Sequence, residues 1–174
     1  GTWLGVSNNW HNPANWCGGV PNASTDVIIP VVGSGKYPNI NSSDAMAHDI
    51  TMDAGTSLMV HDETLHVGGN ITNNGGSFDV TDGALELNGS GVAQNIAGSI
   101  FLDNTIQDLR ISNSSGVNIT GTNDTLKLSG VLKFGVSNAT LNTNNNLTLL
   151  STAMHTASVG DMTNNGTNSN NQIV

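Results

Sequence analysis

Residues 58–87 read LMVHDETLHVGGNITNNGGSFDVTDGALEL, and this stretch decides the fold. It holds four apolar-x-apolar doublets: Leu58/Val60, Leu65/Val67, Phe78/Val80 and Leu85/Leu87. Alternation with a period of two is typical of a β-strand that buries one face. Turns rich in Gly, Asn and Asp separate the doublets, and these residues favour tight turns. The stretch therefore predicts very short strands joined by tight turns.

The same pattern continues on both sides of this stretch. Further doublets are Ile50/Met52, Leu109/Ile111, Val117/Ile119, Leu126/Leu128, Leu132/Phe134 and Leu147/Leu149. They follow one another at roughly seven or eight residues, which is too close for hairpins with strands of ordinary length. Three steps give a period of roughly 20 to 24 residues, the length of one coil in a three-sided parallel β-helix. We therefore expect residues 46–150 to form a β-solenoid of about five coils around an apolar column.

A β-sandwich is the alternative all-β fold. Its turn signals recur every 8 to 12 residues in typical cases. The spacing in this chain is tighter and favours the solenoid.

Residues 1–45 differ in composition, because they hold all three Trp, the single Tyr, all four Pro and the single Cys. A solenoid needs a cover for the end of its apolar column and for its unpaired strand edge. We predict that residues 1–45 form this cap, with Trp3, Trp10 and Trp16 in its core and a buried strand that ends at Pro30. The alternative is that these three rings stack on sugars and form a glycan-binding site.

Ordered motifs run along the chain and resemble a known family. They are WHNPANW at 10–16, GVP at 19–21, DVIIP at 26–30, YPNI at 37–40, LHVGGNITNNG at 65–75 and LKLSGVL at 126–132. As a set, they closely resemble a repeat domain of large secreted proteins of Bacteroidota, which commonly carry a type IX secretion sorting signal. The resemblance implies a right-handed three-sided parallel β-helix in an extracellular or cell-surface protein, and it implies no particular ligand.

The resemblance also bears on the cysteine and on the end of the chain. Relatives often carry a second cysteine where this chain has Ala-Met-Ala at 45–47 followed by His48. We therefore expect Cys17 to be a buried free thiol. Residues 151–174 are rich in Asn, Thr and Gly, and we expect them to lead into a further domain or subunit.

Charge and hydropathy exclude several partners. Only 10% of the residues are charged, and the net charge is −9, which repels the phosphate backbone of nucleic acids. No stretch approaches the roughly 20 apolar residues that span a bilayer, so we expect no membrane insertion. The scarcity of Lys and the abundance of Asn, Gly and Thr fit an exported protein.

The histidines and the acidic turns contain candidate metal ligands. His48, His61 and His66 are candidates for a surface site, but the two histidines of the segment HDETLH at 61–66 are five apart, unlike the spacing in zinc proteases. Asp79, Asp82 and Glu86 could bind calcium, although no calcium-binding repeat or EF-hand loop is present. We expect solvated histidines and no cofactor, with calcium as the alternative.

A few residues are candidates for catalysis or for covalent modification. Arg110 with Asp108 and Asp103 resembles the charged groups of polysaccharide-active β-helix enzymes, but it equally resembles an ordinary ion pair. We therefore expect no enzyme activity and no catalytic residue. Thr125, between Asp124 and Leu126, fits the short O-glycosylation pattern of that bacterial group and is a candidate modification site.

The favoured function is structural or adhesive. We expect a rigid spacer or fibre unit of a secreted bacterial surface protein, whose partners are neighbouring domains or identical subunits at the solenoid ends. A carbohydrate-binding adhesin module is the alternative.

Overall fold

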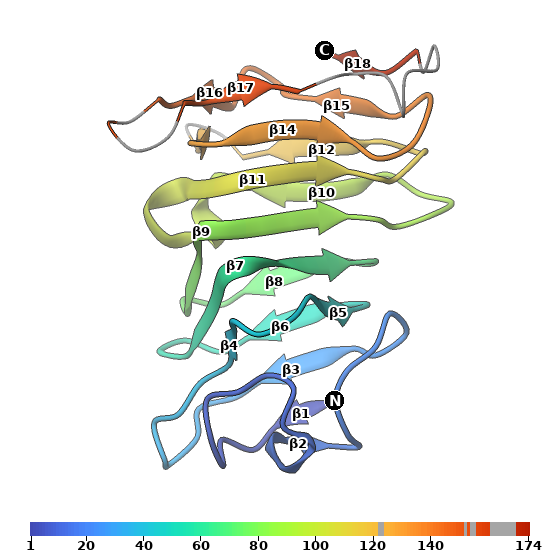
Figure 1. Cartoon of the computed structure of the whole chain (residues 1–174). Coiled ribbons are helices and arrows are strands. Elements are labelled where there is room, and N and C mark those ends of the chain that lie inside the picture. The colour runs from blue at the N-terminus through green and yellow to red at the C-terminus, as the bar shows by residue number, and fades with distance from the viewer. Residues whose placement is uncertain (122–123, 152, 154–155, 161–169) are drawn as a thin grey trace.

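The apolar doublets point inward and stack coil upon coil around one core. The computed structural model describes residues 1–121, 124–151, 153, 156–160 and 170–174. In it the chain winds into a β-helix of about seven turns (Figure 1). Front strands run to the right and back strands to the left while the chain climbs, so the coil is right-handed, as parallel crossovers almost always are. The predicted all-β parallel solenoid is confirmed.

Regular helix is nearly absent from the described residues, which contain three short 3-10 turns: η1 (Pro13–Asn15), η2 (Gly98–Ile100) and η3 (Leu102–Asn104). The first face of the coil is built from two sheets, in the orders β2-β1-β3-β6-β8 and β10-β12-β15-β18. Their strands are β1 (Thr2–Trp3), β2 (Trp16–Cys17), β3 (Val27–Ile29), β6 (Ile50–Met52), β8 (Ile71–Asn73), β10 (Gln94–Ala97), β12 (Val117–Thr120), β15 (Thr140–Asn142) and β18 (Gln172–Ile173). Every pairing is parallel except that of β1 with β2.

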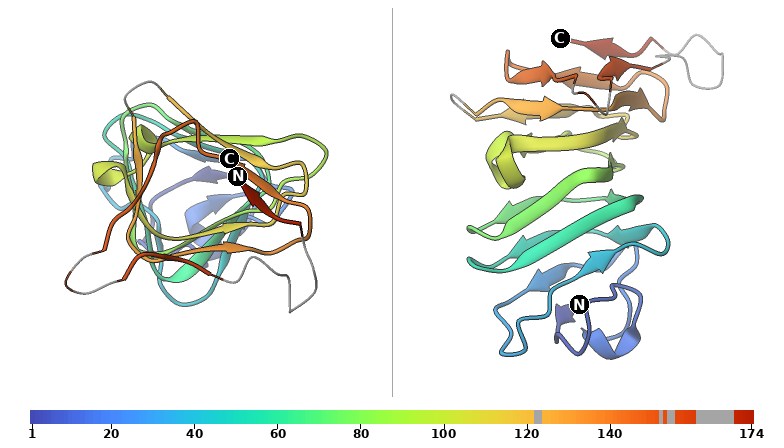
Figure 2. Two further views of the ribbon diagram at one scale, coloured as in Figure 1. Left: turned by 90° about the horizontal axis from the view of Figure 1, so that it is seen from above. Right: turned by 60° about the vertical axis from the view of Figure 1, so that its left-hand side comes forward.

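The second and third faces share three long strands, β7 (Ser57–Val67), β9 (Ser77–Leu87) and β11 (Thr105–Ile111). Their register shifts near the middle, where each strand bends around a corner of the coil. The second face is completed by β4 (Asn39–Ile40), β13 (Leu126–Leu128) and β16 (Leu147–Leu149). The third face is completed by β5 (Ala45–Ala47), β14 (Val131–Phe134) and β17 (Ser158–Val159). Figure 2 shows from above how successive coils superimpose around the core.

Inward residues of the third face form a continuous apolar rank. Its members pair in register from coil to coil and are almost fully buried: Ala45, Leu65, Leu85, Leu109 and Leu132. Burying each leucine side chain stabilises the fold by roughly 1.5–3 kcal/mol. The apolar column predicted from the doublets is therefore present.

The bend of β9 requires a glycine. A Cβ atom on Gly83 would lie 2.8 Å from the carbonyl oxygen of Val60 in the preceding coil. A backbone atom cannot give way as a flexible side chain can, so the corner depends on the missing side chain.

The cap is built around its three tryptophans. Trp16 packs edge-to-face on Trp3 and on Trp10, with ring centroids 4.9 and 4.7 Å apart, a favourable arrangement of aromatic rings. The Trp16 Nε1–H donates to the carbonyl of Trp10 at 2.6 Å. All three side chains are at most 3% exposed. They form the cap core, and their burial removes them as sugar-stacking platforms.

Three features differ from the expectations. The coil begins before residue 46, because β3 already pairs in parallel with β6, and β4 and β5 pair with β7. Pro30 ends strand β3 as expected, but β3 is still a member of the parallel ladder. Cys17 is exposed rather than buried, since Trp16 takes the inward position and alternation turns the next residue outward. At the other end, β17 and β18 carry the ladder past residue 150.

Candidate functional site

Four aspartates fasten consecutive coils, and we call them the corner aspartates. Each directly precedes an inward-facing residue, and its carboxylate accepts the backbone N–H of the register-equivalent residue one coil on. The bonds run from Asp49 N to Asp26 (3.3 Å), from Thr64 N to Asp44 (2.8 Å), from Asn70 N to Asp49 (2.6 Å) and from Val131 N to Asp108 (2.6 Å). Hydrogen bonds to an ionised acceptor are stronger than neutral ones. Four of the 13 acidic residues of the chain therefore link adjacent coils.

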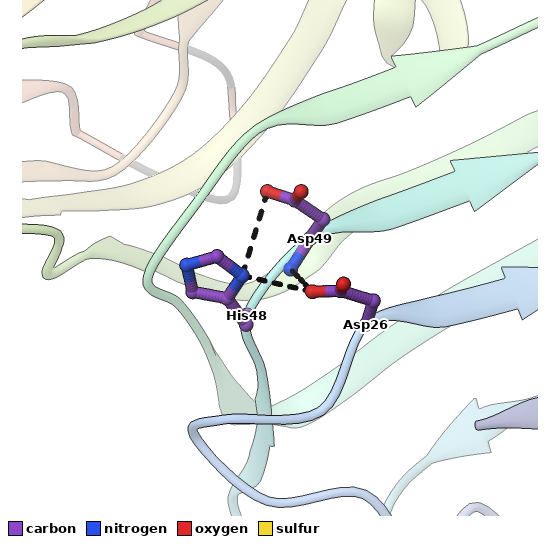
Figure 3. A group of neighbouring side chains, drawn as sticks. All are labelled: Asp26, His48 and Asp49. Atoms are coloured by element: carbon purple, nitrogen blue, oxygen red, sulfur yellow. Dashed lines mark hydrogen bonds and ion pairs between the residues drawn. The ribbon is translucent and has the colours of Figure 1, made fainter.

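The three candidate histidines also bridge coils. His48 Nδ1 lies 2.8 Å from Asp26 Oδ1, His61 Nδ1 lies 2.7 Å from Asp82 Oδ2, and His66 Nδ1 bonds Glu86 Oε2. Figure 3 shows the His48 ring turned toward the two corner aspartates beside it. No cluster of three potential metal ligands in the described part of the chain contains two of these histidines. Among the described residues the three candidate histidines therefore do not come together in one metal site.

Asp26 and His48 favour their charged forms. The hydrogen bond from His48 lowers the pKa of Asp26, and the N–H of Asp49 lowers it further. The same bond to Asp26 raises the pKa of His48. Both side chains are well exposed, so solvent screens the attraction between them.

Two clusters could hold a divalent cation. They are Asp26 with His48 and Asp49, and His61 with Asp62 and Asp82, and in each the ligand atoms lie within 4.8 Å of one another. One imidazole nitrogen with two carboxylate oxygens is a donor set that Zn²⁺ accepts. In both clusters the histidine is already bonded to a carboxylate, so a metal ion would have to displace that bond.

Outward residues on the third face form a second rank in register. From β5 to β14 they are Met46, His66, Glu86, Arg110 and Lys133, and we call the last four the charged rank. Glu86 is at its centre and is buried, with a side chain 10% exposed. Its Oε2 bonds His66, and its Oε1 lies 3.1 Å from Arg110 Nε and accepts the Ser112 hydroxyl.

The charges of Glu86 and His66 are coupled. The hydrogen bond to Glu86 raises the pKa of His66, although burial of the ring opposes this shift. The hydrogen bond from His66 lowers the pKa of Glu86, with further support from Ser112 and from the Arg110 charge. The pair therefore favours its charged forms, and Glu86 bonds the basic side chain on either side of it, His66 and Arg110.

A shallow hollow of about 230 Å³ lies beside the charged rank. Its lining includes the four residues of the rank together with Asp44, Thr64, Ala84, Asp108, Leu109 and Val131. Thr64, Ala84 and Asp108 are neighbours in register on successive coils. The small side chain of Ala84 leaves the space between the longer residues above and below it. The hollow thus combines acceptors, cations and a small apolar floor.

The candidate residues for catalysis and for calcium binding each bond a different partner. Arg110 pairs with Glu86 and not with Asp108, whose carboxylate binds the Val131 N–H. Asp103 accepts from Lys127 Nζ through its backbone carbonyl.

Among the calcium candidates, Asp79 accepts from Thr81 in its own strand, Asp82 pairs with His61, and Glu86 belongs to the charged rank. Within the described part of the chain, these three candidate carboxylates form no common cluster of potential metal ligands. Thr125 is half-buried just before β13, and its glycosylation stays a prediction.

Sequence reasoning missed the corner aspartates and the charged rank. A signal for the first was present, because each corner aspartate stands directly before an inward residue, as in Asp49-Ile50 and Asp108-Leu109. For the charged rank, the only signal in the sequence was that its members are separated by about one coil length.

Within the described residues, no helix has the length and apolar character that crossing a bilayer would need.

Comparison with known proteins places the chain in a family. No curated protein and no solved structure matches the chain. A family model described as a domain of unknown function, DUF8693, matches residues 2–95. This match spans the cap and the first coils and covers more than half of the sequence, and the chain belongs to the DUF8693 family.

Proposed function

We propose that this chain is a non-catalytic structural segment of an exported bacterial surface protein, in which it acts as a rigid spacer. One observation carries the proposal: four aspartates and three histidines, residue types that often do chemistry, are instead bonded from coil to coil around a continuous apolar column. The corner aspartates bind backbone N–H groups, and the histidines of the coil bind carboxylates. Such bonds stiffen a stack of coils.

The mechanics of a solenoid fit this role. Each repeat contacts its neighbours, so the length grows with the number of turns. Seven turns at a strand spacing of roughly 4.8 Å add about 34 Å along the axis. A domain docked at either end would be held at a fixed distance and orientation.

The end of the coil near β18 supports docking of a neighbour. Its exposed apolar residues, each 38–64% exposed, are Leu149, Leu150, Val159, Ile173 and Val174. Apolar residues at the end of a parallel ladder suit a further coil, which could also pair with strands β16, β17 and β18, since each pairs with a single described strand. We propose that a neighbouring domain or an identical subunit takes this place. The composition and the motifs of residues 10–40 support export to the cell surface.

Stretching the purified chain in optical tweezers tests the spacer role. We expect little extension until one or a few cooperative unfolding steps occur, because the coils share one core. Shortening Leu85 to Ala should lower the unfolding force, whereas the same change at the exposed Met59 should not. Gradual extension at low force would refute the spacer role. Release of reducing ends from a panel of polysaccharides would refute the non-catalytic assignment.

A further inference from the structure

We propose that the hollow beside the charged rank binds a sugar unit that carries a negative charge. This ligand site goes beyond the spacer role and does not depend on it. It rests on the arrangement of Arg110, Lys133 and the two corner aspartates that line the hollow, Asp44 and Asp108.

Two cations of the charged rank, on β11 and β14, are adjacent although their charges repel. Arg110 and Lys133 are direct neighbours in register on β11 and β14, an arrangement in which like charges destabilise a sheet. They are two of only four Lys and Arg residues in a chain with a net charge of −9. Among the described residues Lys133 has no hydrogen-bond or ion-pair partner, and Arg110 is engaged through Nε alone. An external anion would relieve this repulsion.

Glu86 positions the arginine for such a ligand. It is buried, and both of its oxygens are occupied by His66, Arg110 and Ser112. Because Glu86 holds the Nε side of the guanidinium, the two Nη groups remain for a carboxylate or sulfate oxygen. A guanidinium held in this way can donate two parallel hydrogen bonds to one anionic group.

The hollow is also lined by hydrogen-bond acceptors that suit the hydroxyl groups of a sugar. Asp44 and Asp108 each use Oδ1 for a corner bond. The Oδ2 atom of Asp108 has no partner among the described residues, and that of Asp44 lies 3.4 Å from His66 Nε2. These oxygens can accept from sugar hydroxyls, while the methyl group of Ala84 offers a small apolar contact.

Size and charge narrow the ligand class. The hollow holds about 230 Å³, less than the roughly 300 Å³ at which sites for drug-sized molecules begin. It therefore accommodates one sugar unit. The acidic protein as a whole repels a dense polyanion such as nucleic acid, whereas a glycan with isolated charges can place one acidic unit here.

Titration of the ¹⁵N-labelled chain by NMR tests this site. The probes are three oligosaccharides of equal length, which carry one uronate unit, one sulfated unit or no charge, at low ionic strength. We expect saturable shifts centred on the charged rank with one or both acidic probes, and weaker binding as salt is added. Binding of the carboxylated or the sulfated probe alone would identify the anionic group and support the site.

Lys133→Gln is the decisive variant, because Lys133 makes no bond to the described residues on which folding could depend. It should weaken binding on the order of tenfold, as expected for losing one charge-assisted hydrogen bond. Lys127→Gln is the matched control, since Lys127 lies on the second face and donates to the Asp103 carbonyl at 3.2 Å, and it should leave binding unchanged. Failure of both acidic probes, equal binding of the neutral probe, or undiminished binding by folded Lys133→Gln would each overturn the proposal.

Discussion

Shortening Leu85 to Ala should destabilise the coil by about 3–4 kcal/mol. Leu85 is fully buried and packs in register between Leu65 and Leu109. Three carbon atoms are lost, at about 0.8 kcal/mol each for the transfer from water. A cavity is also left, because the backbone ladder on both sides holds the neighbouring coils apart, and such cavities add to the cost.

Urea unfolding followed by far-UV circular dichroism measures this loss. Met59→Ala is the matched control, because Met59 lies outward on β7 and is 39% exposed. It should change the free energy of unfolding by less than about 0.5 kcal/mol. Hydrogen exchange should show the loss of protection spreading from β9 to the adjacent coils, since neighbouring repeats share their interfaces. A loss below about 1 kcal/mol at Leu85, or equal losses at both positions, would refute a shared core.

Three further predictions concern the corners, the charged rank and the cap. Asp108→Ala should lower the free energy of unfolding by about 1–2 kcal/mol, because the Val131 N–H loses its acceptor; an unchanged urea midpoint would count against the corner bond. Glu86 contributes stability above its unfolded pKa of 4.5, which is lost as the pH falls through its lower folded pKa. His66 contributes stability at pH values below its unfolded pKa of 6.5. This stability is lost as the pH rises through the higher pKa of His66 in the folded protein. Urea midpoints should therefore be highest between these values, and His66→Asn should reduce the alkaline decline; an identical pH profile in this variant would argue against the pair. Trp10→Ala should cost about 3–5 kcal/mol and promote association in sedimentation, whereas a stable monomer would show that the cap does not depend on this ring.

The apolar column could be predicted because its signal is local. A doublet such as Leu85/Leu87 reveals its buried face within three residues, and the short spacing of doublets excludes ordinary hairpins. The clustering of the tryptophans likewise identified the cap. Its boundary was misplaced because strands within residues 1–45, Val27–Ile29 and Asn39–Ile40, already belong to the parallel ladder.

The outward side chains could not be aligned in the same way. Leu65 pairs with Leu85, 20 residues on, whereas Leu85 pairs with Leu109, 24 residues on. Turns of different length shift the register from coil to coil, and a shift of one residue turns a side chain to the opposite face. The adjacency of Arg110 and Lys133 therefore depends on the register of strands β11 and β14, which the sequence alone does not reveal.

The pairing of residues one coil apart is the central claim, and backbone nuclear Overhauser effects measure it directly. We predict contacts of the parallel type that link Leu65 with Leu85, Leu85 with Leu109, and Leu109 with Leu132. Short distances between the Cα hydrogens of strands adjacent in sequence, which antiparallel hairpins of a β-sandwich produce, would contradict the solenoid and the spacer role built upon it.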